Sequence, residues 1–454
     1  MLRLAKKELS EWYQSDSKAL LITGARQIGK TYLINEFLSE NCESVLKVNL
    51  LENNNVVALL NESKNAKDLL MRLSLAIPEA KLISGKTVIF IDEVQVCKEI
   101  VTAIKFLVEE GSYKYILSGS LLGVELSNIR SAPVGYLRII EMYPMDFREF
   151  LIANGISKEV FSHLENAFEN LTEVDSFVHE KILELFKLYL IVGGMPAVVK
   201  TYIETNNIQK VIEQQNFIRE LYKVDISKYD KDKKLYLNEI FDLIPSELNQ
   251  QNKRFILKNL NEKQKYSRVE NSFIWLKNAG VALPTFCADE VKYPLKLSKN
   301  SNLFKLFFCD TGMLCSMFMN NIQTKILLGE KDINFGSVYE NIVAQELASK
   351  GIDLYYYKNK KLGELDFVIE LNEKFIPIEV KSGKDYKKHN ALNNILEKAE
   401  SDIQRAYILS NSNVETDGKK VYLPIYMVMF LKNKVQSPEV YKIDLSALKD
   451  WKKK

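Results

Sequence analysis

Short apolar runs alternate with helical patterns through the first third of the chain. The runs lie at residues 19–22, 45–50, 87–91, 113–117 and 137–142. Their length and apolar character are typical of parallel strands buried on both faces. Apolar residues at helical spacing occupy residues 32–38 and 66–77. Strands that alternate with helices predict an α/β fold with a doubly wound parallel sheet.

The middle of the chain changes to helical spacing. Residues 157–189 place apolar side chains on one face and predict a helical lid packed on the preceding sheet. Gly193, Gly194 and Pro196 interrupt this pattern. They form either a hinge or a simple turn between two helices.

Shorter segments follow residue 233. They lie at residues 235–248, 254–260 and 267–278 with helical spacing, and at 281–284 and 293–297 as extended pieces. Three helices and a hairpin predict a winged-helix module. Cations lie on or just before its third helix, at Lys263, Lys265, Arg268 and Lys277. These cations would contact the phosphates of DNA. Alternatively, they only keep a surface helix hydrated, an interpretation that Glu262 and Glu270 among them favour.

The last third predicts a second α/β module. Helices are expected at residues 336–347 and 391–401, and strands at 354–357, 364–371, 375–381, 405–410, 422–430 and 441–445. At roughly 150 residues per domain, the chain of 454 residues should contain two to four domains. We divide it into residues 1–155, 156–232, 233–300 and 301–454.

Composition narrows the class of protein. Hydrophobic residues make up 46% and charged residues 27% of the chain, as in soluble globular proteins. The net charge of +3 neither requires nor excludes nucleic acid. The five cysteines show no C-x-x-C spacing, which predicts reduced thiols without zinc or disulfides. The longest apolar stretch, residues 188–199, is too short for a membrane span, so we expect a cytoplasmic protein without a membrane partner.

A glycine-bearing loop joins the first strand to the first helix of the predicted sheet. It reads G-x-x-x-x-G-K-T and consists of Gly24, Ala25, Arg26, Gln27, Ile28, Gly29, Lys30 and Thr31. Its two glycines permit positive φ, so backbone N–H groups can turn onto a β-phosphate at the helix N-terminus. Lys30 would reach the β- and γ-phosphates, and Thr31 would place its hydroxyl on Mg²⁺. The loop therefore predicts binding of ATP with Mg²⁺.

Two further strand ends carry side chains that fit this chemistry. The third apolar run ends in Asp92 and Glu93, at the sheet edge where parallel strands carry functional groups. Asp92 would hold Mg²⁺ through water, and Glu93 would orient and activate the attacking water. Ser118 and Ser120 follow the next run. They either touch the γ-phosphate or the attacking water, or serve as plain turn residues.

These motifs resemble the AAA-type ATPases of bacteria and archaea that carry a C-terminal domain of unknown function. The similar segments are residues 24–31, 88–95, 116–120, 143–151 and 192–199. The resemblance implies ATP hydrolysis and assembly into a homo-oligomer. Many relatives carry Gly-Arg before the fifth strand, whereas here Tyr136 follows Gly135 and the nearest arginines are Arg130 and Arg138. No arginine finger is therefore assigned.

Four residues of the last module resemble the metal site of the PD-(D/E)xK nuclease fold. They are Glu340 on a helix, Asp366 at the start of a strand, and Glu379 and Lys381 on the next strand. Side chains two positions apart on a strand share a face. The resemblance implies carboxylates that hold Mg²⁺ against a scissile phosphate, and a lysine that assists the attacking water. Charged alternation on an edge strand also produces this pattern, so the fold is predicted and cleavage is left open.

Two functions are consistent with these patterns. The first is an ATP-hydrolysing AAA-type ATPase whose nucleotide cycle controls a DNA-directed winged-helix and nuclease-like tail. The second is a nucleotide-operated switch or scaffold whose C-terminal modules hold protein partners and cleave nothing.

Overall fold

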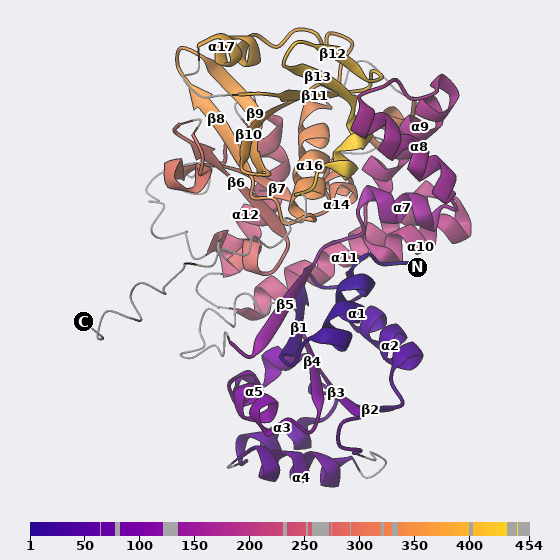
Figure 1. Ribbon diagram of the computed structural model, residues 1–454, viewed down its shortest axis with the longest axis vertical. Coiled ribbons are helices and arrows are strands. Elements are labelled where there is room, and N and C mark those ends of the chain that lie inside the picture. Colours follow the sequence, from indigo (N-terminus) through magenta and orange to yellow (C-terminus); the bar gives the residue numbers. More distant parts are fainter. Residues whose placement is uncertain are drawn as a thin grey trace, which may run out of the picture.

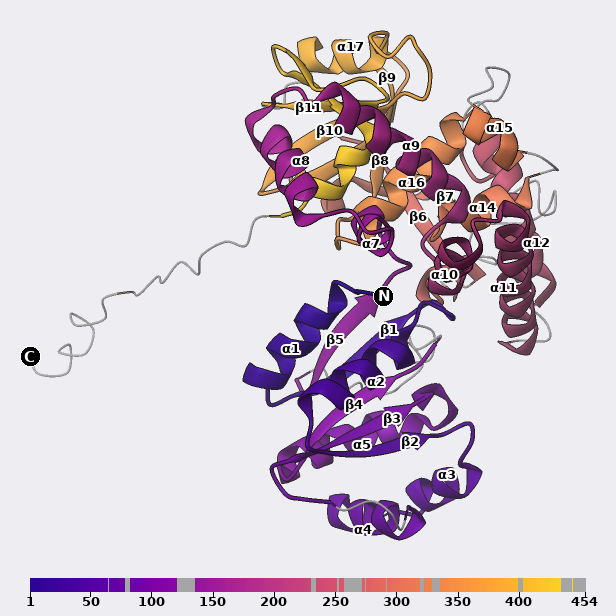
Figure 2. The same cartoon turned by 90° about the vertical axis from the view of Figure 1, so that its right-hand side faces the viewer.

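The structure is a computed structural model that describes residues 1–63, 65–77, 82–120, 135–229, 234–250, 253–256, 272–273, 275–290, 292–318, 322–328, 335–398, 403–433 and 443. The chain forms two bodies stacked along the long axis (Figure 1). The lower body ends with strand β5, and the upper body contains the later helices and strands. The N-terminus lies where the two bodies meet (Figure 2).

A parallel five-stranded sheet forms the centre of the lower body, in the order β2-β3-β4-β1-β5. Its strands are β1 (Ala19–Gly24), β2 (Ser44–Asn49), β3 (Thr87–Asp92), β4 (Lys114–Ser118) and β5 (Leu137–Met142). Each coincides with a predicted apolar run to within a few residues. The predicted α/β class of this body is confirmed.

Helices cover both faces of this sheet. They are α1 (Ala5–Ser15), α2 (Lys30–Asn41), α3 (Asn54–Asn61), α4 (Ala66–Ala76) and α5 (Lys98–Glu110). Leu20 and Ile22 of β1 belong to one core with the apolar residues of α1 and α2. Ala19 and Leu21 belong to a separate core with α3, α4 and α5. Because alternate residues of a strand face opposite sides, the unbroken apolar run of β1 serves both cores.

The upper body contains a mixed sheet of eight strands, in the order β12-β13-β11-β10-β9-β8-β6-β7. The strands are β6 (Ala282–Ala288), β7 (Lys299–Phe308), β8 (Tyr355–Asn359), β9 (Gly363–Leu371), β10 (Lys374–Val380), β11 (Ala406–Ser410), β12 (Glu415–Asp417) and β13 (Lys420–Pro424). Its later helices are α14 (Thr311–Met317), α15 (Ile322–Leu328), α16 (Gly336–Ala348) and α17 (Asn390–Lys398), with 3-10 helices η3 (Leu295–Ser298) and η4 (Ile425–Phe430).

The first strand expected in the wing, residues 281–284, belongs to this large sheet as part of β6. β6 pairs with β7 in antiparallel register and with β8 in parallel register. Residues 293–297, expected to be extended, instead lead into the 3-10 helix η3 after Pro294, whose missing N–H cannot join a ladder. Half of the expected helix at residues 267–278 lies outside the described residues, together with Lys263, Lys265 and Arg268.

The strand expected at residues 422–430 is shorter than predicted. β13 ends at Pro424, and the 3-10 helix η4 occupies the remainder, because proline has no N–H to continue the ladder. The strand expected at residues 441–445 lies outside the described residues except for residue 443.

Helices connect the two sheets. They are α7 (Phe147–Ala153), α8 (Lys158–Asn170), α9 (Ser176–Val192), α10 (Pro196–Thr205), α11 (Ile208–Tyr229) and α12 (Lys234–Asn249). The predicted lid on the first sheet is wrong for α8 and α9, which pack on the upper body (Figure 1). The ring of Phe168 lies 5.5 Å from that of Phe430, and His179 Nδ1 lies 2.9 Å from the Tyr426 hydroxyl. The aromatic residues of η4 give these helices apolar surface to bury.

The break between α9 and α10 is closely packed. Met145 N donates to the Gly194 carbonyl at 2.7 Å, and a Cβ at Gly194 would meet the Met145 oxygen at 2.0 Å. A Cβ at Gly193 would meet the Asp310 carboxylate at 2.3 Å. The two glycines therefore bring the start of α7 and the start of α14 into contact with this turn.

Among the described helices, none combines the length and apolar character needed to cross a membrane.

Candidate functional site

The loop that follows β1 lies at the carboxyl edge of the lower sheet. β1 sits between β4 and β5, and β3 lies beyond β4, with all strands parallel. The carboxyl ends of β1, β3 and β4 therefore meet at one edge. Such an edge, where the strand order reverses, is the usual position of a ligand site in an open α/β sheet.

Three positive φ angles shape this loop. Gly24 has φ = 130°, Gln27 has φ = 67° and Gly29 has φ = 85°. A Cβ at Gly24 would meet the Met142 oxygen of β5 at 2.1 Å, so only glycine fits there. Gly29 is the N-cap of α2, which places the backbone N–H groups of the first helical turn at the end of the loop. The backbone geometry is that of an anion-binding turn.

Lys30 lies against the loop itself. The residue is 8% exposed, and Nζ donates to the carbonyl oxygens of Gly24 at 3.0 Å and Ala25 at 2.7 Å. Burial lowers the pKa of Lys30 to about 8, although the nearby carboxylates of Glu93 and Asp92 act to raise it. The ammonium is therefore held at the loop, where phosphate oxygens would replace carbonyl partners.

Asp92 joins the loop to two strand ends. Thr31 Oγ1 donates to Asp92 Oδ2 at 2.9 Å, and the buried Ser118 hydroxyl donates to Asp92 Oδ1. Hydroxyl and carboxylate oxygens are the ligands that Mg²⁺ prefers. The donor set of Thr31 and Asp92 therefore fits Mg²⁺, with Asp92 free to act through a water ligand.

Glu93 has an unusual backbone conformation. Its φ is 58°, which is uncommon for a residue other than glycine, and its N–H donates to Asp92 Oδ1 at 3.0 Å. The Gln95 amide donates to Glu93 Oε2. Gln95 was not among the predicted site residues. It holds the Glu93 carboxylate beside Asp92.

Arg3 connects the loop to Glu149 at the start of α7. Arg3 Nη1 donates to the Ile28 carbonyl at 2.6 Å, Nη2 donates to the Tyr143 carbonyl at 2.7 Å, and Nε lies 3.2 Å from both Glu149 oxygens. Glu149 also closes a capping box with Asp146 at the start of α7. The D-x-x-E spacing was a readable signal for the cap. No local pattern identified Arg3 as its partner.

The upper body also contacts the loop. Arg26 forms an ion pair with Asp225 of α11, and the Tyr222 hydroxyl donates to the Arg26 carbonyl at 3.0 Å. Gly280 has φ = 71°, and a Cβ there would meet the Ala25 nitrogen at 2.8 Å. Helix α11 and the turn before β6 therefore lie directly against the loop.

Of the four residues predicted for the last module, Glu340 lies on α16, Asp366 on β9 and Glu379 on β10, and Lys381 directly follows β10. Val380 N donates to Asp366 Oδ2 at 2.9 Å, and Lys381 Nζ lies 3.8 Å from Glu379 Oε2. Burial raises the pKa of Glu379, and the neighbouring Asp366 carboxylate adds to this effect. Glu340 is buried and contacts Lys305, a residue that was not predicted. Within the described part of the chain, no group of His, Cys, Asp and Glu side chains is arranged to hold a metal ion.

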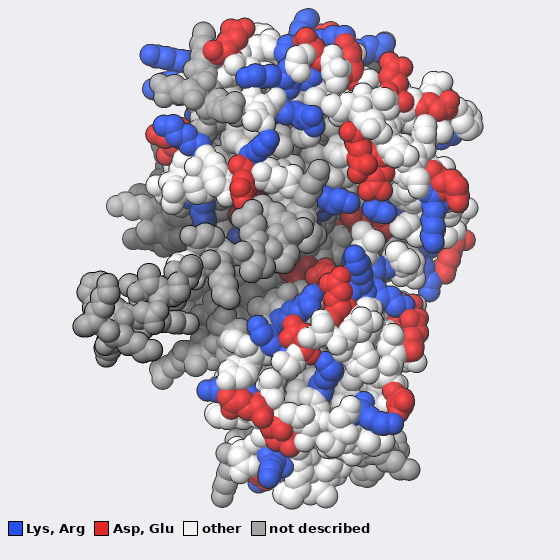
Figure 3. All heavy atoms as spheres, viewed as in Figure 1, with Lys and Arg blue, Asp and Glu red and all other residues white. Residues whose placement is uncertain are grey.

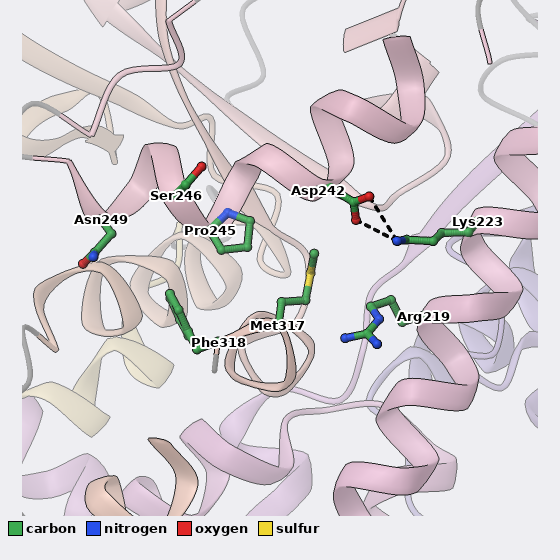
Figure 4. Close-up of a pocket in the computed structure, with 8 residues that line it drawn as sticks. All are labelled: Arg219, Lys223, Asp242, Pro245, Ser246, Asn249, Met317 and Phe318. Atoms are coloured by element: carbon green, nitrogen blue, oxygen red, sulfur yellow. Dashed lines mark hydrogen bonds and ion pairs between the residues drawn. The ribbon is translucent and has the colours of Figure 1, made fainter. Parts of the chain in front are cut away.

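A separate hollow of about 690 Å³ lies beside α11 and α12 (Figure 4). Its lining comprises Arg219, Lys223, Asp242, Pro245, Ser246, Asn249, Met317 and Phe318. The Lys223 ammonium is paired with Asp242 at 2.8 Å. None of the predicted site residues lines it.

On the face shown in Figure 3, the described Lys and Arg side chains are interspersed with Asp and Glu on both bodies.

Comparison with known families divides the chain into three parts. Residues 16–151 match an AAA domain, and residues 183–324 and 335–428 match two domains of unknown function. No curated protein is similar enough to count as a match. The part of the chain that forms the lower body therefore matches an AAA domain. The winged-helix and nuclease-like modules stay predictions.

Several solved structures are similar to the chain. The Walker-type ATPase of Pyrococcus abyssi is 14% identical over 69% of this chain and 94% of its own, with a TM-score of 0.42. The Thermotoga maritima RuvB Holliday junction branch migration motor is 12% identical over 41% of this chain and 69% of its own, with a TM-score of 0.21. Cdc6p from Pyrobaculum aerophilum is 11% identical over 73% of this chain and 95% of its own, with a TM-score of 0.25.

Proposed function

We propose that the lower body binds ATP with Mg²⁺ and hydrolyses it at the loop after β1. The observation that supports this most directly is the position of Asp92. Its two oxygens contact Thr31 on the loop and Ser118 at the end of β4, so one carboxylate joins the three elements. A P-loop ATPase needs this arrangement, because the metal, the phosphates and the attacking water must share one edge of the sheet.

Each side chain has a role in this proposal. The backbone N–H groups from Gly24 to Thr31 and the Lys30 ammonium bind the phosphates, and Thr31 and Asp92 hold Mg²⁺. The metal, when bound, neutralises charge that develops on the β- and γ-phosphate oxygens. Glu93 accepts a proton from the attacking water, and Ser118 orients that water or the γ-phosphate. Catalysis therefore consists of positioning and charge stabilisation.

The test is the Glu93→Gln variant. It should bind ATP with unchanged affinity and lose roughly 10²–10⁴-fold in turnover, the usual contribution of a general base. Phosphate release measures turnover, and titration with a fluorescent nucleotide measures binding. Glu99→Gln is the matched control, because Glu99 is a nearby acid in the first turn of α5. Equal turnover in Glu93→Gln and wild type would remove Glu93 as the base.

We further propose that the nucleotide state reaches the upper body through α11 and the turn at Gly280. The support is direct contact. Asp225 and Tyr222 hold Arg26, and Gly280 lies against Ala25. A phosphate group in the loop would attract the Arg26 guanidinium and so weaken its pair with Asp225. The loop and the upper body would then change together.

DNA is the proposed ligand of the upper body, with protein partners as the alternative. The proposal depends on the cations at residues 263–277, of which only Lys277 is described. Binding through phosphates releases counterions, so affinity for an oligonucleotide should fall steeply between 50 and 200 mM salt, by up to about 10³-fold for several contacts. Reversing Lys277 to Glu should weaken binding further. Salt-independent or undetectable binding would favour protein partners, and a homo-oligomer would then be sought by light scattering with and without ATP.

A further inference from the structure

Lys305 lies in the middle of the carboxylate cluster of the upper body. It sits on β7, and its side chain is 1% exposed. A lysine this deeply buried is rare unless its charge is compensated. The groups that balance the charge of Lys305 therefore indicate which cation this cluster binds.

The compensation comes from Glu340, one of the residues predicted to bind metal, and from Glu364, which was not predicted. Lys305 Nζ lies 3.5 Å from Glu340 Oε2 and 3.2 Å from Glu364 Oε1, and it lies 5.0 Å from the centre of the Tyr356 ring. Although burial acts to lower it, the carboxylates of Glu340, Asp366 and Glu364 raise the pKa of Lys305. The ammonium is therefore charged and held between carboxylates.

A second lysine completes the arrangement. Lys253 forms an ion pair with Glu340 Oε1, so both oxygens of this buried carboxylate face an ammonium group. Despite burial, Lys305 and Lys253 hold the pKa of Asp366 below its ordinary value. Together these two lysines supply two positive charges, as many as one Mg²⁺ ion.

The nuclease resemblance implied Mg²⁺ at this cluster, but the residues present do not fit it. Mg²⁺ needs oxygen ligands at about 2.0–2.1 Å in a near-octahedral shell. The ammonium groups of Lys305 and Lys253 instead occupy both oxygens of Glu340, one of the predicted ligands, and an ammonium group cannot itself act as a ligand. A dication beside two fixed ammonium groups would also be repelled at close range in a medium of low dielectric.

We propose that Lys305 and Lys253 take the place of a divalent cation in this module, which therefore binds no metal at the cluster and cleaves no nucleic acid. The ion pairs of the cluster instead have a structural role. Through Lys305, Glu340 and Glu364 they join β7 to α16 and β9. The far end of α16 carries Glu346, whose carboxylate accepts the Phe147 N–H of α7 at 2.7 Å. These ion pairs thus fix the position of α16, which contacts α7 after β5.

Metal binding to the full-length protein tests the proposal first. Mn²⁺ is titrated without nucleotide and followed by electron paramagnetic resonance, in wild type and in Glu379→Gln. The difference between the two isolates the cluster from the phosphate loop. Identical binding curves are expected. Binding that Glu379→Gln removes, or Mn²⁺-dependent nicking of plasmid DNA that the same variant abolishes, would overturn the proposal.

Removal of the internal cation is the second test. Lys305→Met keeps most of the length of the side chain and deletes its charge, so the freed carboxylates should acquire one Mn²⁺ site and Mn²⁺ should raise the thermal midpoint. The matched control is Lys350→Met, because Lys350 pairs at 2.8 Å with the buried Glu346, which lies on α16 as Glu340 does. The control should gain no site. A folded Lys305→Met protein that acquires none would refute the substitution of lysine for metal. If Lys305→Met does not fold, the wild-type comparison with Glu379→Gln decides.

Discussion

The Arg3 guanidinium donates a hydrogen bond of 2.6 Å to the carbonyl oxygen of Ile28, two residues before Lys30. The same group pairs with Glu149, which is 146 positions away in the sequence and 4% exposed. The guanidinium thus braces the phosphate loop against the start of α7. Its planar fork reaches several acceptors at once, which an ammonium cannot reproduce.

Arg3→Lys should therefore weaken ATP binding about tenfold while most of the stability remains, because the charge opposite Glu149 is kept. Arg3→Ala should in addition cost about 3–5 kcal/mol of stability, since it leaves a buried carboxylate unpaired. Nucleotide titration and urea unfolding measure the two effects. Lys6→Ala is the control, because the pairs that Lys6 of α1 forms with Glu36 and Glu40 of α2 are partly exposed and contribute little. Wild-type affinity in a folded Arg3→Lys protein would contradict the bracing role.

Asp225→Asn should strengthen ATP binding. Neutralising Asp225 frees the Arg26 guanidinium to turn to the phosphates. The Arg26 side chain is 37% exposed, so the gain should be at most about 1 kcal/mol, or about fivefold in affinity. Asp242→Asn, which breaks the Lys223 pair elsewhere on α11, should leave affinity unchanged. Weaker binding by Asp225→Asn would show that the pair supports the loop and does not compete with the nucleotide.

Gly280→Ala should disturb the phosphate loop. The new Cβ would lie 2.8 Å from the Ala25 nitrogen, and the residue would keep a strained φ of 71°. Gly351 offers a matched control, because it has φ = 68° and a Cβ there would meet nothing within 4 Å. Both substitutions should cost about 1 kcal/mol of stability for the backbone. Only Gly280→Ala should also lower ATP affinity and turnover. Equal kinetics in both variants would show that Gly280 does not couple the phosphate loop to the upper body.

ATP affinity should depend on pH through Lys30, whose pKa burial lowers to about 8. Below pH 8 the free protein presents an ammonium to the phosphates, and above it a neutral amine. The apparent dissociation constant should therefore rise about tenfold by pH 9, as the charged fraction falls. Turnover at saturating ATP should stay constant up to a higher pH, because bound phosphates stabilise the charged form of Lys30. Lys30→Ala should bind weakly without this transition. A flat profile in wild type would show that the charge of Lys30 contributes little to binding.

Much of the lower body could be predicted from the sequence. The strands β1 to β5, the loop from Gly24 to Thr31 and the pair Asp92-Glu93 were all found from patterns of a few neighbouring residues. Such patterns are informative because strand burial, helix periodicity and positive φ are local properties. Parallel strands then bring their carboxyl ends to one edge, so Thr31, Asp92 and Ser118 could be expected to meet.

The support of that site was decided by tertiary structure. Arg3, Asp225 and Gly280 reach the loop from distant parts of the chain, and no local pattern marks such pairs. The last module shows the same limit. Its four nuclease-like residues were found by spacing, but only the pairing of β7 within the large sheet places Lys305 among them. The order of residues determined which groups could form the cluster. Packing decided that a lysine fills it, because a buried carboxylate takes whichever cation the fold brings within reach.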